Sequence, residues 1–206
     1  MRTDPPSQLP GGVARIPQGD EAELAARARA GDRAAFGTLV ERFAPQARRV
    51  ARAVLQNPDD ADDAAQDAFL SALVKLDQYD PRRPFGPWLM RIVANAATDR
   101  RRRRAVRQTE PLAPELATGR EGGWGAGGAS RPNHEAERRA LGERLRLALA
   151  QLPERRRMAV VLFDVEGYSH AEIAAILGIP EGTARSEVFH ARRALRALLQ
   201  DWKEEG

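Results

Sequence analysis

A cluster of acidic residues near position 60 is the first feature of the sequence that could carry chemistry. Five aspartates fall within nine positions: Asp59, Asp60, Asp62, Asp63 and Asp67. They could stabilise the start of a helix, hold a divalent cation, or accept arginines from a protein partner. Asp63, Gln66 and Asp67 have i, i+3 and i+4 spacing, so a helix would project them together. No second acidic or histidine cluster completes a metal site, which leaves helix stabilisation and protein docking open.

A run of arginines, from Arg100 to Arg104 and then Arg107, forms a stretch of positive charge. At the end of a helix such a run complements the helix dipole, and it could also contact nucleic-acid phosphates. Three aromatic residues and an amide precede it: Tyr79, Phe85, Trp88 and Asn95. Unstacked bases of a single strand bind surfaces of this composition, although Trp88 could equally be a core residue.

Residues 169–200 have the pattern of a helix-turn-helix. Ser169 and Glu172 match a capping box, Ala174 is small where two helices must cross, and Gly178 permits a left-handed turn. The outward face of the second helix carries Arg185, Ser186, Phe189, His190, Arg192 and Arg193. These side chains could reach bases and phosphates in a major groove. The alternative is a helical hairpin with a solvated charged face.

Apolar residues recur at helical spacing through most of the chain, and the alternation typical of strands is almost absent, so helices are predicted throughout. Asp32 is a predicted N-cap, and Pro45 and the Asn57-Pro58 pair are predicted breaks. A broad buried stripe is predicted on the third helix, at Ala61, Ala64, Ala65, Ala68, Phe69, Ala72, Leu73 and Leu76.

Six of the ten residues from 119 to 128 are glycines. Fixing so many glycines is entropically costly, so this segment is predicted to be a flexible tether. The predicted organisation is a flexible tail at 1–19, a helical domain at 20–108, a flexible linker at 109–135 and a helix-turn-helix domain at 136–206. The predicted fold class is therefore all-α, with two small helical domains joined by a flexible linker.

Composition excludes several classes of protein. The 206 residues are 42% hydrophobic and 30% charged, with a net charge of +4, which is a globular balance. No run approaches ~18 apolar residues, so no membrane insertion is expected, and residues 1–20 lack the apolar core of a signal peptide, which favours a cytoplasmic protein. The absence of cysteine excludes disulfides and thiol catalysis. The three scattered histidines exclude a His-rich metal site. No metal, cofactor or enzymatic activity is expected.

Two sets of motifs resemble the extracytoplasmic-function (ECF) group of bacterial RNA polymerase sigma factors. Asp60-Ala-Asp-Asp-Ala-Ala-Gln-Asp-Ala-Phe69, with Pro87-Trp-Leu-Met-Arg-Ile-Val-Ala-Asn95 and Asp99-Arg100, resembles region 2 of these proteins. Leu152-Pro153, the stretch from Gly167 to Thr183, and Ala191-Arg192 resemble region 4. The two resemblances stand in the order of the family and are separated by a variable linker.

The resemblance implies an alternative sigma factor that directs promoter-specific initiation and makes no bond itself. It implies that Asp63, Gln66 and Asp67 bind the β′ clamp helices of core RNA polymerase, whose β subunit is a further contact. It implies binding of the promoter −10 element, and melting there, by Tyr79, Phe85, Trp88, Asn95, Arg100 and Arg101. It implies −35 recognition by Arg185, Ser186, Phe189, His190 and Arg192. The implied partners are core polymerase, promoter DNA and an anti-sigma factor.

Two positions of the second helix depart from the family pattern. Relatives commonly carry basic residues where this chain has Glu187 and His190. Phosphates would repel an acid, so Glu187 is predicted to turn aside, to accept from a cytosine amino group, or to pair with a neighbouring arginine.

Two other classes of protein fit parts of the sequence. A helix-turn-helix repressor or activator would use its first lobe for dimerisation or ligand binding and would bind duplex DNA without polymerase. A metal-dependent enzyme would use the cluster from Asp59 to Asp67. The region 2 motif argues against the first, and the missing second ligand cluster argues against the second.

Overall fold

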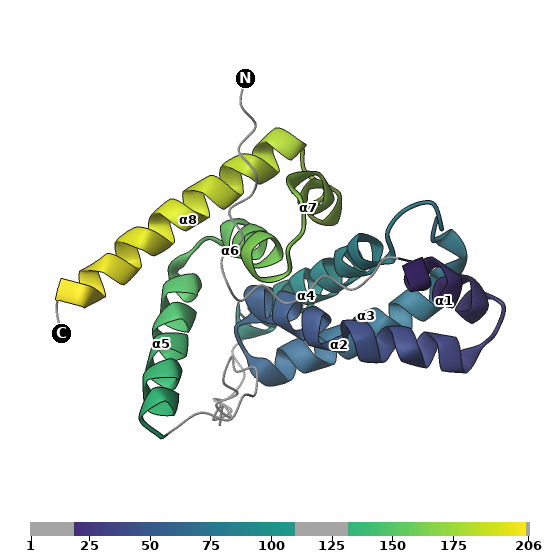
Figure 1. Cartoon of the computed structure of the whole chain (residues 1–206), viewed down its shortest axis with the longest axis horizontal. Helices are drawn as coiled ribbons and strands as arrows, with labels where there is room; N and C mark the ends of the chain where they lie inside the picture. Colours follow the sequence, from purple (N-terminus) through teal and green to yellow (C-terminus); the bar gives the residue numbers. More distant parts are fainter. Residues whose placement is uncertain (1–18, 110–131, 205–206) are drawn as a thin grey trace.

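The computed structural model describes residues 19–109 and 132–204, which form helices joined by short turns (Figure 1). The helices are α1 (Gly19–Arg29), α2 (Arg33–Leu55), α3 (Pro58–Val74), α4 (Phe85–Thr109), α5 (Pro132–Gln151), α6 (Glu154–Val160), α7 (His170–Leu177) and α8 (Glu181–Glu204), with single turns η1 (Leu76–Gln78) and η2 (Val161–Val165). No strand occurs in these two ranges, and the all-α prediction is confirmed. The predicted tether at 119–128 lies outside the described residues.

Local signals set the start of α2 and α3. The Asp32 carboxylate accepts hydrogen bonds from the backbone N–H groups of Ala34 and Ala35. The bond from Ala35, followed by the Arg27 guanidinium, lowers the pKa of this carboxyl. Asn57 caps α3 by accepting from the N–H of Asp60, and Pro58 occupies the first turn, where its missing N–H costs nothing. The predicted break at Asn57-Pro58 is therefore the start of a helix.

Pro45 does not interrupt α2, so the predicted break there was wrong. The helix runs continuously from Arg33 to Leu55, and Pro45 lies on its exposed side. The proline leaves the carbonyl of Glu41 without its helical donor, but at an exposed position water can take that place. The buried stripe of Phe43 and Ala47 continues on the opposite side, so packing outweighs the local break signal.

Small side chains let α3 pack closely against both α2 and α4. Its buried residues are Ala61, Ala64, Ala65, Ala68, Phe69 and Ala72. This confirms most of the predicted stripe, because alanine lets neighbouring backbones approach where larger residues would hold them apart. Leu73 is the exception, because 46% of its surface is exposed.

The helix-turn-helix forms as predicted from α7 and α8. Ser169 and Glu172 make both bonds of the capping box. Gly178 ends α7 with a φ of 66°, in the left-handed region that glycine enters without strain. The inner face of α8 carries the buried residues Ala184, Val188 and Ala191, and α8 packs against α7 and α6.

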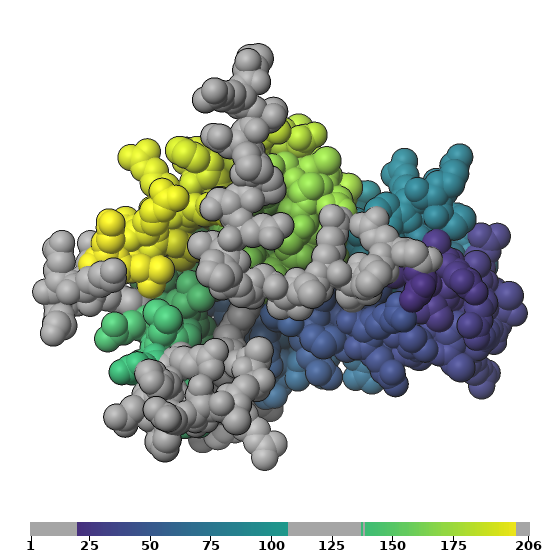
Figure 2. All heavy atoms as spheres, viewed as in Figure 1, coloured from purple at the N-terminus to yellow at the C-terminus, as the bar shows by residue number. Residues whose placement is uncertain are grey.

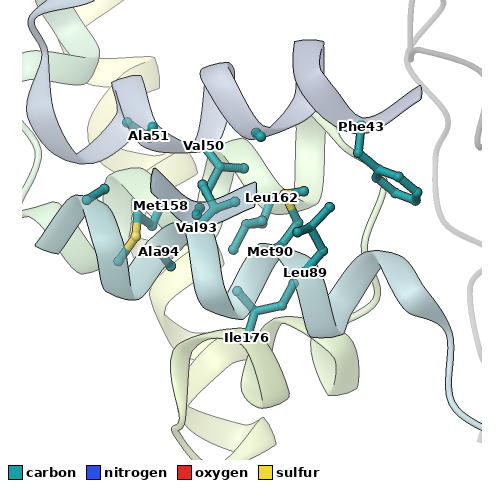
Figure 3. Packing of buried hydrophobic residues seen from close by; sticks show 14 of the residues in the cluster. Phe43, Val50, Ala51, Leu89, Met90, Val93, Ala94, Met158, Leu162 and Ile176 are labelled. Atoms are coloured by element: carbon teal, nitrogen blue, oxygen red, sulfur yellow. The ribbon is translucent and has the colours of Figure 1, made fainter. Parts of the chain in front are cut away.

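The two lobes, α1–α4 and α5–α8, pack against each other and share one hydrophobic core. Figure 3 shows Leu162 and Ile176 of the second lobe facing Leu89 and Met90 of α4. All four residues are at most 1% exposed. The view in Figure 2 likewise shows atoms of the second lobe in contact with those of the first. A tethered pair of domains does not by itself predict such an interface, so this packing is a result of the tertiary structure.

Polar groups are also buried between the lobes. The side chain of Glu166, 1% exposed, accepts from Nε and Nη2 of Arg49 at 2.6 and 2.8 Å and from Gln46 at 3.1 Å. The bond to Glu166 raises the pKa of Arg49. Tyr168 donates to the Gln46 side chain at 3.0 Å. An added Cβ at Gly86 would lie 2.9 Å from the Tyr168 hydroxyl, so a larger residue there would force this hydroxyl to shift.

Arg157 is a second polar link between the lobes. Its guanidinium is buried and donates to the backbone carbonyl of Ala53 in α2 and, at 3.0 Å, to that of Leu152. Burial lowers the pKa of Arg157. Backbone carbonyls of both lobes thus converge on a single cation, which ties α6 to the end of α2.

Replacing Glu166 by glutamine should destabilise the packed structure. The amide keeps the shape of the side chain but turns one acceptor into a donor, which would face Arg49 or Gln46. We expect a loss of about 1–3 kcal/mol in the free energy of unfolding, measured by urea titration. Glu143→Gln is the matched control, because Glu143 pairs with Arg146 on an exposed surface and should cost less than about 0.5 kcal/mol. Equal losses in the two variants would mean that the Glu166 pair contributes no more than a surface pair.

Candidate functional site

The exposed side of α3 carries acidic residues near its start and apolar residues near its end. This surface, called here the α3 face, consists of Asp63, Gln66, Asp67, Leu70, Leu73 and Val74. These residues follow i, i+3, i+4, i+7, i+10 and i+11 spacing, so they form one stripe along the helix. The three apolar members are 60%, 46% and 82% exposed. Sequence reasoning placed Leu73 in the core and missed Leu70 and Val74, although their spacing from the acids was the available signal.

Arg100 of α4 reaches across to α3 and contacts three of its carboxylates. Its Nη2 lies 2.5 Å from Oδ2 of Asp63, its Nε 3.2 Å from Asp60, and its Nη1 3.7 Å from Asp67. Arg104 adds a contact to Asp60 at 2.5 Å. Arg100 and Asp63, predicted to lie on separate surfaces, are therefore brought together in the structure.

The predicted aromatic residues form one cluster at the start of α4. The ring centroids of Tyr79, Phe85 and Trp88 lie 5.3 Å apart in each pair, and Phe43 adds a ring 5.5 Å from Phe85. Tyr79 and Phe85 are buried, whereas Trp88 is partly exposed. The Tyr79 hydroxyl donates to the carbonyl of Arg83 at 2.6 Å. In this conformation the cluster positions the loop that precedes α4.

The loop before α4 presents two arginines that sequence reasoning did not single out. Arg82 and Arg83 have side chains 87% and 82% exposed. Asp80 accepts from the side chain and the backbone N–H of Arg82, and these bonds lower the pKa of Asp80 to about 2. The loop therefore carries ordered positive charge beside the aromatic cluster.

Asn95 and Arg101 lie further along α4 in different surroundings. Asn95 is exposed. Arg101 pairs at 2.5 Å with Glu154 at the start of α6, and Thr98 donates to the same carboxylate at 3.2 Å. One of the predicted DNA-binding arginines is therefore held by the second lobe in this arrangement.

The outer face of α8 carries the residues predicted for the major groove. Arg185, Ser186, Phe189 and His190 are exposed, Phe189 by 61%. Arg192 instead pairs with Asp164 of η2 and lies over the Phe163 ring at 4.8 Å. Glu187 pairs with Arg156 of α6 at 3.3 Å. Of the three predicted alternatives for this acid, the structure therefore has the pairing with a neighbouring arginine.

A hollow of about 570 Å³ opens beside these residues. Its lining consists of Phe163, His170, Arg185, Val188, Phe189, Arg192, Arg193 and Arg196. Of its four arginines, Arg192 pairs with Asp164 and Arg185 with Glu181 at 3.2 Å, and Arg193 and Arg196 add further positive charge. Burial, followed by the charge of Arg185, lowers the pKa of His170, which favours its neutral form.

Comparisons with known proteins match both lobes. The family model "Sigma-70 region 2" matches residues 39–107, and "Sigma-70, region 4" matches residues 142–195. The chain is 38% identical to the ECF RNA polymerase sigma factor SigM of Mycobacterium tuberculosis, over 87% of this chain and 84% of that protein. This chain belongs to the ECF sigma factors. It is also 34% identical to the ECF sigma-E factor of Escherichia coli K12, over 86% of this chain and 93% of the relative.

Solved structures give the same fold for this sigma factor. The structure of CnrH in complex with the cytosolic domain of CnrY is similar with a TM-score of 0.63 at 32% identity, over 89% of this chain and 99% of that one. The sigma factor RpoE of Bartonella quintana, in complex with the anti-sigma factor NepR, is similar with a TM-score of 0.61 at 26% identity, over 80% and 96% of the two chains. The resemblance to the ECF group and the prediction of an alternative sigma factor are confirmed.

The residues predicted for binding lie within the ranges that the two family models match. The region 2 match includes the α3 face and Asn95, and the region 4 match includes α7 and the outward residues of α8. A repressor's dimerisation lobe does not account for the region 2 match. Within residues 19–109 and 132–204, no group of three or more histidines and acids is placed to hold a metal ion. No helix of the same ranges has the length and apolar character needed to cross a membrane.

The buried phenol of Tyr79 should make the stability of this sigma factor sensitive to alkaline pH. Burial, then the charges of Glu21 and Asp80, raises the pKa of Tyr79 to about 12, against about 10 in an unfolded chain. The folded state therefore keeps a proton that the unfolded state loses, and its stabilising effect, complete below about pH 10, is lost as the pH rises toward about 12. Urea titrations at about pH 9 and 11 should show a larger loss for the natural protein than for Tyr79→Phe. Equal losses would mean that solvent reaches the phenol.

Proposed function

We propose that this sigma factor binds core RNA polymerase through the α3 face and promoter DNA through α4 and α8. The observation that carries the proposal is the match of region 2 and region 4 to two lobes that each expose a suitable surface. The family directs promoter-specific transcription, and the residues proposed for each contact follow from exposure, charge and position.

The α3 face has the make-up of a protein-docking surface. Protein interfaces combine apolar residues with polar ones, and along this stripe the exposed Leu70, Leu73 and Val74 follow directly after the polar residues. The side chains of Asp63 and Asp67 are 60% and 67% exposed, so their carboxylates can accept hydrogen bonds from basic side chains of the β′ clamp helices. We place core polymerase here, with the β subunit as a further contact of the bound factor.

The −10 element is proposed to bind along α4 and the loop before it. Asn95 is exposed and can hydrogen-bond to an unstacked base, while Arg83, whose side chain is 82% exposed, can bind a phosphate. Tyr79 and Phe85 act from the core by holding this loop, and Trp88 offers its exposed edge. Melting then proceeds by capture, since binding a flipped base offsets a few kcal/mol of unstacking.

The −35 element is proposed to bind the outer face of α8 as duplex DNA. Arg185, Ser186, Phe189 and His190 point outward where a recognition helix meets base edges. Arg192 holds the helix to η2 and lies beside the positive hollow. Glu187 is taken up by Arg156, so no free carboxylate of that residue opposes the phosphates.

The lobes are proposed to separate when both promoter elements are bound. Elements centred near −10 and −35 lie about 25 base pairs apart, which is roughly 85 Å at 3.4 Å per base pair. Lobes that share one core cannot span that distance, and separation also frees Arg101 from Glu154. The compact arrangement is thus a state that precedes simultaneous binding of both promoter elements.

An anti-sigma factor is proposed as a further partner. The Bartonella RpoE is in complex with the anti-sigma factor NepR, and CnrH is in complex with the cytosolic domain of another protein, CnrY. The lobes of this chain pack together without another protein between them. A partner that clamps the packed lobes from outside fits this geometry better than one that wedges between them.

Transcription with purified components tests the proposed function. The factor with core enzyme should initiate RNA at discrete 5′ ends.

The double variant Asp63→Ala with Gln66→Ala should weaken core binding at least tenfold. Its thermal unfolding should stay unchanged, because both residues are exposed. Asp77→Ala, which removes an exposed acid outside the α3 face, is the control. Failure of the natural protein to bind core polymerase, or to start transcription, would contradict the proposal.

Replacing Arg185 by alanine should reduce −35 discrimination. If this side chain reads a base edge, the variant should lose about 1–3 kcal/mol of preference for the natural element over a scrambled one. Holoenzyme binding to the two promoters is the measurement. Arg155→Ala, at an exposed arginine of α6, is the control. A uniform loss on both promoters would instead assign Arg185 to phosphate contact.

A further inference from the structure

Arg100 stands at the centre of an ion-pair cluster between two surfaces that the proposed function assigns to different partners. Its three nitrogen atoms are directed at Asp60, Asp63 and Asp67. Two of those acids belong to the α3 face, proposed for polymerase. Arg100 itself belongs to the basic end of α4, which the family resemblance assigns to the −10 element and whose arginines suit its phosphates.

A guanidinium engaged in this way has little capacity left for a phosphate. It has five N–H donors in one plane, and all three of its nitrogens already point toward α3. The side chain is also only 34% exposed. To contact DNA, Arg100 must leave the carboxylates, and leaving them uncompensated is unfavourable because Asp60, Asp63 and Asp67 repel one another.

We propose that Arg100 is an internal competitor for the polymerase-binding carboxylates and is exchanged for basic side chains of the polymerase when the sigma factor docks. The proposal rests on the proposed function, since it uses the α3 face as the polymerase site. Basic groups of the partner take over Asp63 and Asp67, and Arg100 becomes available to a phosphate. Asp60 remains neutralised by Arg104, which contacts it at 2.5 Å.

The exchange links the two binding events. Polymerase binding releases a phosphate ligand, and by thermodynamic reciprocity DNA that holds Arg100 strengthens polymerase binding by the same factor. The free chain, with Arg100 occupied, should bind −10 DNA weakly. Exposed ion pairs are individually weak, so we expect a threefold to tenfold change in affinity.

Arg100→Ala tests the exchange, and Arg48→Ala is its matched control. Arg48 also pairs with an α3 carboxylate, Asp62 at 3.5 Å, but Asp62 lies outside the α3 face. Each variant loses one positive charge and removes an arginine that pairs with a carboxylate of α3. The dissociation constant for core polymerase is measured without DNA and then with a single-stranded oligonucleotide carrying the −10 sequence.

Without DNA, Arg100→Ala should bind core polymerase threefold to tenfold more tightly than the natural protein, and Arg48→Ala should change less than twofold. The oligonucleotide should tighten polymerase binding of the natural protein and of Arg48→Ala, but not of Arg100→Ala. In an Asp63→Asn background the gain from Arg100→Ala should shrink, because the competed carboxylate is gone.

Weaker polymerase binding by Arg100→Ala would overturn the proposal and make Arg100 a residue that positions the α3 face. Equal effects of Arg100→Ala and Arg48→Ala would also overturn it, because a general change of charge would then explain both. Each of these results requires that the natural protein binds core polymerase. Failure of that binding would instead contradict the proposed function, so the two failures are distinguishable.

Discussion

A buried carboxylate between two lobes is stable only when other groups replace the water that it loses. The Glu166 carboxylate accepts hydrogen bonds from Arg49 and Gln46 in place of water, and it can do so only when the second lobe is packed against α2. The same packing buries Leu89 and Met90 of α4 against Leu162 and Ile176. This interface decides which parts of α4, α6 and α7 are covered, and with them whether the −10 surface along α4 is complete.

The interface leaves some surfaces open and closes others. The α3 face and the outer side of α8 remain exposed, so polymerase and the −35 duplex can reach them in the packed arrangement. Arg101 is held by Glu154 of the other lobe, so full −10 binding is tied to separation of the lobes. The order of events suggested by this geometry is docking first and full engagement of the −10 element afterwards.

Arginine, which makes up nearly all the positive charge of the chain, serves several purposes in this fold. Arg157 is buried and organises backbone carbonyls, Arg156 takes up the acid at position 187, and Arg100 spans three carboxylates. The planar, multi-donor guanidinium suits each of these roles. A count of arginines alone therefore overstates the charge that is free for DNA, because many are already engaged within the protein.

The sequence by itself determined the helices, their caps, the helix-turn-helix and the family, because these depend on local spacing: the Ser169–Glu172 capping box, Gly178 and the alanine stripe of α3 all act within a few residues. It also placed Asp63, Gln66 and Asp67 on one face. Only the tertiary structure decided that Pro45 is tolerated in α2, that Leu73 is exposed, and that Arg100 and Glu166 meet partners far along the chain. Those outcomes depend on which surfaces come together, and helical periodicity specifies an apolar or charged face without specifying what covers it.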